Sequence, residues 1–245
     1  MKPALAALLV VLFGAAAPPC AARNADQTDH AWLTRERRQL RFDYANDFFA
    51  GKDRYYTQGI GLSYFDPALR RSPLMRLLPA LPGAERHYGL ALRHSGFTPT
   101  SLAHDEALRA DRPFAAYFHL GHRLISRDRE RGLTLTAELA AGIVGQGAGG
   151  KWMQTGIHRA LGNLLPRGWD NQVRNDLALD YFARLEKIAL GGGRAERAVA
   201  GDATLGSLYT NASAGLLARL GSLAGPEKRA FLFIEAEEKL VGYDA

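Results

Sequence analysis

The chain has 245 residues, a formal net charge of +6 and one cysteine. This length suits one large all-β unit or one to two ordinary domains, and the basic balance suits a polyanionic partner such as nucleic acid, anionic lipid or lipopolysaccharide. A single cysteine excludes a disulfide framework, and no stretch of 18 continuous apolar residues is present to form a membrane-spanning helix.

The N-terminus has the composition of a secretory signal peptide. Lys2 precedes an apolar run over residues 4–17, and the small residues of "CAA" (20–22) follow as a cleavage site. A lipoprotein anchor on Cys20 is the alternative. The two prolines directly before Cys20 argue against it. We expect residues 1–22 to be removed and residues 23–245 to form one exported domain. Export argues against nucleic acid as a partner.

Alternating apolar and polar residues then predict about eight strands. In the first, Leu40, Phe42 and Tyr44 share one face, while Arg41 and Asp43 share the other. The candidate strands, in chain order, cover residues 38–47, 58–65, 86–95, 114–126, 131–145, 176–190, 203–221 and 229–242.

Evenly spaced strands and 26 glycines indicate a sandwich or a barrel. Strand lengths of about 9–11 residues suit a tilted crossing of a bilayer, and the polar second faces suit a wet lumen. A soluble exported β-protein accounts for the alternation nearly as well. The prediction is an all-β, antiparallel outer-membrane β-barrel.

Two segments break this rhythm. Residues 70–87, "RRSPLMRLLPALPGAERH", predict a loop with a helical turn, because prolines interrupt a semi-apolar stretch. Residues 149–169 predict a short helix near 150–163, with "GAGG" before it and Pro166 and Gly168 after it.

Two polar groups are candidates for chemistry. Gln154 and His158 are four residues apart, so a helix places them on one face, where the imidazole suits a general base. Asn46, Asp47 and Thr57 flank a hairpin, where three oxygen-bearing side chains could hold a hard cation such as Ca²⁺. The plainer alternatives are a histidine and a glutamine in a loop, and ordinary turn chemistry.

Other catalytic signatures are absent. No G-x-S-x-G occurs, and the nearest sequence, "NASAG" around Ser213, lacks the first glycine. No H-E-x-x-H or phosphate-binding glycine loop occurs either. The segment "DRPFAAYFHLG" (111–121) predicts an ion pair before a strand, and "PRGWDNQVRND" (166–176) has the composition of an ordinary loop.

Several of these segments, in order, resemble the lipid A 3′-O-deacylase family of outer-membrane proteins. They are "NDFFAGKDRYYTQGIGLSY" (46–64), "GFTPT" (96–100), "DRPFAAYFHLG" (111–121), "GIVGQGAGGKWMQTGIH" (142–158), "GWDNQVRND" (168–176) and "EEKLVGYDA" (237–245). The resemblance reaches from about residue 38 to the C-terminus.

The resemblance implies an outer-membrane barrel of about 12 strands that hydrolyses the 3′-linked acyl chain of lipid A with calcium. It assigns His158 as general base, and Asn46, Asp47, Thr57 and Gln154 to the site, with Asp47 at the metal. Lys52 and Arg54 are assigned to the lipid A phosphates on charge alone. The implied partners are lipid A, lipopolysaccharide and the lipids of the outer membrane, and the oligomeric state stays open.

The chain departs from the family pattern at three places. "Phe-Ala-Ala" follows the Asp-Arg-Pro block where Tyr-Ala-Gly is common, and Asp176 stands where Glu is usual. The chain also stops at "VGYDA", so we expect a C-terminally incomplete barrel lacking its last strands. Two other functions remain open at this point: a non-catalytic barrel that passes or binds a solute, and a serine-type outer-membrane phospholipase.

Overall fold

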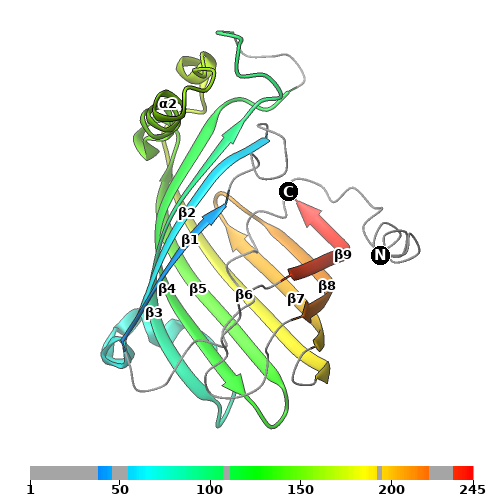
Figure 1. Ribbon diagram of the computed structural model, residues 1–245. Coiled ribbons are helices and arrows are strands. Elements are labelled where there is room, and N and C mark those ends of the chain that lie inside the picture. The colour runs from blue at the N-terminus through cyan, green and yellow to red at the C-terminus, as the bar shows by residue number, and fades with distance from the viewer. Residues whose placement is uncertain (1–37, 46–54, 107–110, 192–194, 221–233, 245) are drawn as a thin grey trace, which may run out of the picture.

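The computed structural model describes residues 38–45, 55–106, 111–191, 195–220 and 234–244, and within them one antiparallel sheet (Figure 1). Nine strands follow one another in chain order, each hydrogen-bonded to the next. They are β1 (Gln39–Ala45), β2 (Tyr55–Phe65), β3 (Glu85–Thr98), β4 (Ala115–Asp128), β5 (Leu133–Val144), β6 (Asp176–Gly191), β7 (Ala195–Gly206), β8 (Asn211–Leu220) and β9 (Ile234–Asp244). The predicted antiparallel all-β fold is confirmed.

One strand prediction was wrong. The segment 203–221 was predicted as a single strand, but it contains the end of β7, a turn and the whole of β8. Most of β7 was missed, because its sequence "AERAVAGDATLG" is rich in alanine and glycine, which have low strand propensity. Its alternation shows only in the structure, where inward residues such as Ala198, Ala200 and Asp202 are buried and their neighbours are exposed.

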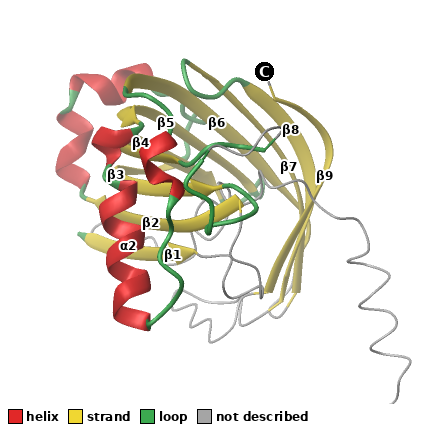
Figure 2. Ribbon diagram, turned by 90° about the horizontal axis from the view of Figure 1, so that it is seen from above, coloured by secondary structure: helices red, strands yellow, loops and turns green. Residues whose placement is uncertain are grey.

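The sheet is curved (Figure 2), and its two faces differ in composition. The convex face carries exposed apolar side chains on almost every strand whose side chains are described. They include Leu40, Phe42, Leu62, Leu92, Phe118, Leu120, Leu177, Leu179, Leu185, Val199, Leu205 and Leu216. The predicted two faces of the first strand are confirmed, since Arg41 and Asp43 lie opposite this apolar set and form an ion pair of 2.6 Å.

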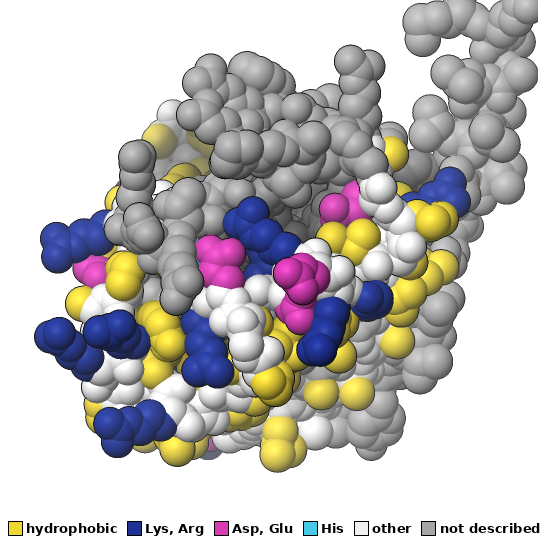
Figure 3. All heavy atoms as spheres, turned by 90° about the horizontal axis from the view of Figure 1, so that it is seen from below, with side chains coloured by type: hydrophobic (Ala, Val, Ile, Leu, Met, Phe, Trp, Pro, Cys, Tyr) yellow, Lys and Arg dark blue, Asp and Glu magenta, His cyan; other side chains and the backbone are white. Residues whose placement is uncertain are grey.

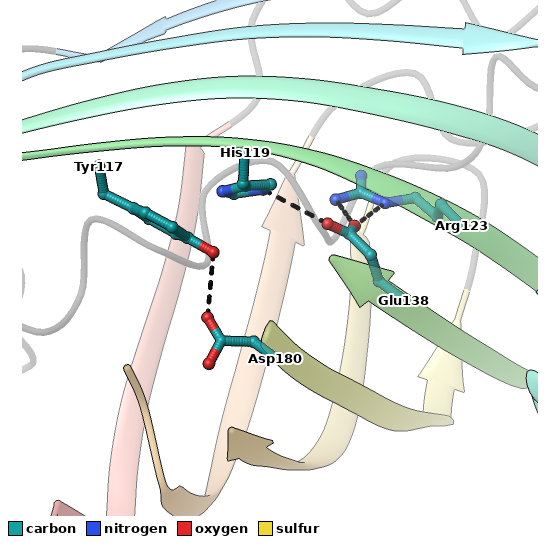
Figure 4. A network of polar contacts seen from close by, with 5 residues as sticks. All are labelled: Tyr117, His119, Arg123, Glu138 and Asp180. Atoms are coloured by element: carbon teal, nitrogen blue, oxygen red, sulfur yellow. Dashed lines mark hydrogen bonds and ion pairs between the residues drawn. The ribbon is translucent and has the colours of Figure 1, made fainter. Parts of the chain in front are cut away.

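The concave face carries buried charges that pair across strands (Figure 4). Glu138 on β5 accepts from Arg123 on β4 at 2.6 Å and lies 3.5 Å from the His119 ring nitrogen. Tyr117 donates to Asp180 at 3.1 Å. Farther along the sheet, Arg184 on β6 pairs with Asp202 on β7, which also accepts from Ser213 on β8. These pairs satisfy charges that would otherwise be costly to bury.

A glycine makes room for the pair of Arg123 and Glu138. On β4, Arg123 is opposite Glu138 and Gly121 lies diagonally across from it, and any Cβ on Gly121 would overlap the Glu138 carboxylate. The carboxylate therefore lies close to the backbone of β4 at Gly121. A side chain at position 121 would displace it from Arg123.

The connections leave the sheet at two opposite ends. At one end lie the loop between β3 and β4 and the long connection 145–175, which contains α2 (Gly150–Leu161), η5 (Gln146–Ala148) and η6 (Gly168–Asn171). At the other end, η3 (Pro67–Arg71) and η4 (Pro73–Leu77) join β2 to β3. No helix in the described part of the chain is long and apolar enough to span a bilayer.

The predicted helix near 150–163 is confirmed, but its stop signal was wrong. The helix ends at Leu161, because Gly162 adopts a left-handed conformation (φ 69°) and its N–H caps the last turn. The N–H of Asn163 donates to the His158 carbonyl at 2.8 Å and completes this cap. Pro166 and Gly168 come after the chain has already left the helix.

Candidate active site

Helix α2 lies against the convex wall of the sheet, outside its curve (Figure 2). Its first residue, Gly150, touches Ala116 of β4 so closely that a Cβ would lie 2.5 Å from the Ala116 Cβ and from the Trp169 ring. Ala116 alternates along β4 with the inward residues and shares its face with the exposed Phe118 and Leu120. The helix therefore covers the apolar outer face of the wall, at the end where β2, β4 and β6 begin.

The wall beneath the helix is shaped by a β-bulge at Thr57. The register between β2 and β3 shifts between Tyr56 and Gln58, so Thr57 is the extra residue of the bulge. A Cβ placed on Gly96 of β3 would lie 3.2 Å from both the Thr57 and the Gln58 side chains. The bulge thus turns two consecutive side chains onto the same side of the wall, where both are almost fully buried.

Gln154 makes two hydrogen bonds of defined direction, and one of them joins α2 to this bulge. The indole N–H of Trp169 donates to Gln154 Oε1 at 2.7 Å, and an indole nitrogen is only a donor. The Gln154 amide oxygen must therefore face Trp169, and its Nε2 donates to Thr57 Oγ1 at 2.8 Å. The result is a chain of donors from Trp169 through Gln154 to the Thr57 hydroxyl.

His158 lies one helical turn after Gln154 and is 5% exposed. Its Nδ1 is 2.6 Å from the Leu164 carbonyl, which the helix cap at Gly162 folds back toward the ring. A carbonyl oxygen only accepts, so Nδ1 carries the hydrogen. In the neutral imidazole the lone pair is then on Nε2, the tautomer that a general base requires.

The segments that suggested the family resemblance meet around this helix. Thr100 of "GFTPT" donates from its backbone N–H (2.7 Å) and its hydroxyl (2.5 Å) to Asp111 of "DRPFA". The hydroxyl bond from Thr100 is the main cause that lowers the pKa of Asp111, and the backbone bond adds to it. Asn175 accepts from the Gly147 N–H at 2.6 Å, and Lys151 pairs with Asp170 at 2.6 Å. Long-range contacts thus hold the loops of this end together.

The structure brings together three of the predicted site residues: Thr57, Gln154 and His158. The predictions for Asn46, Asp47, Lys52 and Arg54 fall in the segment 46–54, which lies outside the described residues. Among the residues that are described, no group of three or more His, Cys, Asp or Glu side chains could hold a metal ion. The calcium prediction, which rests on Asp47, therefore stays a prediction.

Three further residues of this end were not predicted from the sequence. Trp169, in the segment interpreted as an ordinary loop, is fully buried and packs against Phe114 with ring centroids 4.8 Å apart. Gln58 lies beside Thr57, and His94 Nε2 donates to the Ala148 carbonyl at 3.0 Å. A tryptophan in a polar, glycine-flanked loop was the one local sign that this loop is anchored in the structure.

A wall of long antiparallel strands, apolar outside and charged inside, is characteristic of outer-membrane β-barrel proteins. The comparisons with known proteins agree. A family model described as "Outer membrane protein LpxR" matches residues 5–238, and the chain belongs to this family. The chain is therefore an outer-membrane protein, and the predicted family resemblance is confirmed.

A solved structure supports the same fold. LpxR from Salmonella typhimurium superimposes with a TM-score of 0.62 at 20% sequence identity, over 79% of this chain and 70% of that chain. None of the curated proteins compared with the chain matches it. At the level of the family, membership supports an outer-membrane lipid A deacylase.

Proposed function

We propose that the chain is an ester hydrolase that removes the 3′-linked acyl chain of lipid A. The observation that carries the proposal is the state of His158, held as the Nδ1–H tautomer by the Leu164 carbonyl beside the Gln154–Thr57 pair. This group lies on the membrane-facing wall, where the acyl chains of a lipid would reach it. A general base next to aligned hydrogen-bond donors is suited to acyl transfer to water.

The reaction follows from this arrangement. Nε2 of His158 takes a proton from water, and the water oxygen attacks the ester carbonyl carbon. The carbonyl oxygen becomes negative in the tetrahedral intermediate, and the bond to the sugar oxygen then breaks. His158 returns the proton to the leaving sugar oxygen, so the products are a lipid A alcohol and a free fatty acid. Each hydrogen-bond donor aimed at the developing oxyanion typically contributes about 2.7–4 kcal/mol.

Thr57 and Gln154 support the proposal as a preorganised pair. Thr57 accepts from Gln154, so the hydrogen of its own hydroxyl is directed to another group. Asn46, Asp47 and Thr57 carry the oxygen atoms that Ca²⁺ prefers, and Asp47 would supply the carboxylate. A bound Ca²⁺ would polarise the ester carbonyl. Lys52 and Arg54 would bind the lipid A phosphates, and residues 1–22 would direct export.

Mass spectrometry of lipid A after incubation with the purified full chain tests this function. We expect the loss of the acyl group linked at the 3′ position, release of the free fatty acid, and no reaction once EDTA has removed calcium. Lipid A already lacking the 3′ acyl group is the control substrate and should be unchanged. Unaltered lipid A, with solute flux through the protein in liposomes, would favour the channel instead. Hydrolysis that a serine-directed reagent abolishes would favour the phospholipase.

Trp169→Phe tests whether the donor chain positions the site. The phenyl ring keeps the packing on Phe114 but removes the N–H that holds the Gln154 oxygen. An unsatisfied buried acceptor costs about 1–3 kcal/mol, so we expect kcat to fall by about 5- to 150-fold with a smaller change in KM. The matched control is Trp152→Phe, because Trp152 lies on α2 close to Gln154 but is 80% exposed. Equal activity of the two variants would show that the indole N–H has no positioning role.

A further inference from the structure

A second segment lies on the convex wall, at the end opposite α2 (Figure 1, lower left). It covers residues 67–81, including η3 and η4, and we call it the 67–81 segment. Met75 and Leu78 are buried against Leu124 of β4 and Ala137 of β5. Leu124 and Ala137 are cross-strand partners on the face that carries the exposed apolar side chains.

Two hydrogen bonds fix the segment to this wall. Tyr181 on β6 donates its hydroxyl to the Leu77 carbonyl at 2.9 Å, and the Leu81 N–H donates to Ser126 Oγ on β4 at 3.0 Å. The 67–81 segment is therefore held in a fixed position on the outer surface. Because the chain is an outer-membrane protein, the part of this outer surface that lies within the bilayer faces lipid.

The outward side of the segment combines leucine and arginine. Leu74 and Leu77 are 39% and 59% exposed, and Arg70, Arg71 and Arg76 are exposed beside them. No acidic residue occurs between positions 67 and 84. Within the described residues, no hydrogen bond or ion pair engages these three guanidinium groups. The view from below shows basic side chains around the described edge of this end, with apolar side chains between them (Figure 3).

We propose that the 67–81 segment binds the headgroups of anionic phospholipids at the membrane boundary. Exposed leucines favour insertion at the edge of the hydrocarbon region, while arginine stems lie along apolar surface and carry the charge to the phosphate level. Each basic residue near an anionic membrane surface contributes about a fivefold gain in binding. The three unpaired charges are the complement of an anionic headgroup layer.

The proposal takes only its orientation from the proposed function. If α2 faces the leaflet that holds lipid A, the 67–81 segment at the other end faces the opposite, phospholipid leaflet. The lipid contact itself follows from the surface and from membership of an outer-membrane family. It therefore stands whether or not the chain hydrolyses lipid A.

Native mass spectrometry of the purified full chain in neutral detergent tests the binding. The probes are phosphatidylglycerol, phosphatidylcholine and lipid A, titrated separately. We expect phosphatidylglycerol to bind better than phosphatidylcholine, and the variant R70Q/R71Q/R76Q to lose about a hundredfold of the phosphatidylglycerol affinity. The charge-matched control is R129Q/R131Q/R167Q, whose arginines pair with Glu85, Asp128 and Asp105, and it should keep the preference.

Three outcomes would overturn the proposal. The first is equal binding of the two phospholipids by the wild type. The second is a preference for phosphatidylglycerol that is unchanged in R70Q/R71Q/R76Q. The third is that the triple variant loses binding of lipid A and keeps binding of phosphatidylglycerol. Lipid A hydrolysis is measured on the same samples. Its absence from the wild type would count against the proposed function only, because the lipid-binding readout does not depend on turnover.

A spin label gives a second reading that does not require the triple variant to fold. Leu77→Cys in a Cys20→Ser background is labelled and reconstituted into phosphatidylglycerol bilayers. We expect the label at position 77 to collide more often with oxygen than with a water-soluble nickel reagent, which is the behaviour of a label at the headgroup boundary. Arg131→Cys, in the exposed turn between β4 and β5, is the aqueous control. The same nickel accessibility at both positions would place the segment in water and overturn the proposal.

Discussion

His158→Ala is expected to reduce the rate of lipid A deacylation by about 10²- to 10⁴-fold, the range typical for loss of a general base. The physical reason for the loss of rate is the tautomer of the His158 ring. The Leu164 carbonyl fixes the hydrogen on Nδ1 and leaves Nε2 as the basic nitrogen, and alanine supplies neither. The rate is measured on mixed micelles containing lipid A, with mass spectrometry of the product.

Two variants separate chemistry from structure at this position. Asparagine retains a side-chain N–H near the Nδ1 position, so His158→Asn keeps a donor for the Leu164 carbonyl but no base, and it should be as inactive as alanine. His122→Ala, on β4 away from α2, removes an imidazole elsewhere and should keep full activity. An active His158→Asn would show that the ring only anchors the helix cap.

Glu138→Leu is expected to lower the free energy of unfolding by about 3–5 kcal/mol, because it leaves the Arg123 guanidinium buried without its carboxylate. Arg123 and Glu138 are 2% and 6% exposed and 2.6 Å apart, so water cannot readily replace the lost partner. His119 loses the same carboxylate. Reversible urea unfolding in lipid vesicles, followed by tryptophan fluorescence, measures the change.

The double variant R123M/E138L distinguishes a charge effect from a packing effect. Removing both partners also removes the buried cation that lost the Glu138 carboxylate, so we expect most of the lost stability to return. Lys151→Ala is the comparison at a solvent-exposed pair, where the bond to Asp170 is expected to contribute at most about 1 kcal/mol. A double variant as unstable as E138L alone would show that the carboxylate acts through its packing over Gly121.

The strands were predictable because side chains in a strand alternate with a period of two. Leu40, Phe42 and Tyr44 on one side of "QLRFDYA" define β1 and its lipid face without any long-range information. Most of β7 could not be predicted in this way, because alanine and glycine on both faces hide the alternation of apolar and polar side chains. The stop signal of α2 is Gly162 and not the predicted Pro166 and Gly168, because the left-handed conformation of one glycine is enough to end a helix.

The candidate site was predictable in part for a related reason. The spacing of Gln154 and His158 is local to one helix, so the sequence places them on one face. Their partners are not local: Thr57 is 97 residues before Gln154, and Trp169 reaches Gln154 from a separate loop. The bulge at Thr57 depends on the pairing of β2 with β3, which no single segment specifies. The roles assigned to Asn46 and Asp47 still rest on the family resemblance, and those assigned to Lys52 and Arg54 rest on charge alone.

The position of α2 on the outside of the wall has a consequence for kinetics. In the proposed function, a lipid that diffuses laterally in its own leaflet reaches Thr57 and His158 from the side, without leaving the bilayer or entering the lumen. Encounters are then two-dimensional. Turnover depends on the mole fraction of lipid A in the surface, so dilution with inert amphiphile slows the reaction even at a constant bulk amount of substrate.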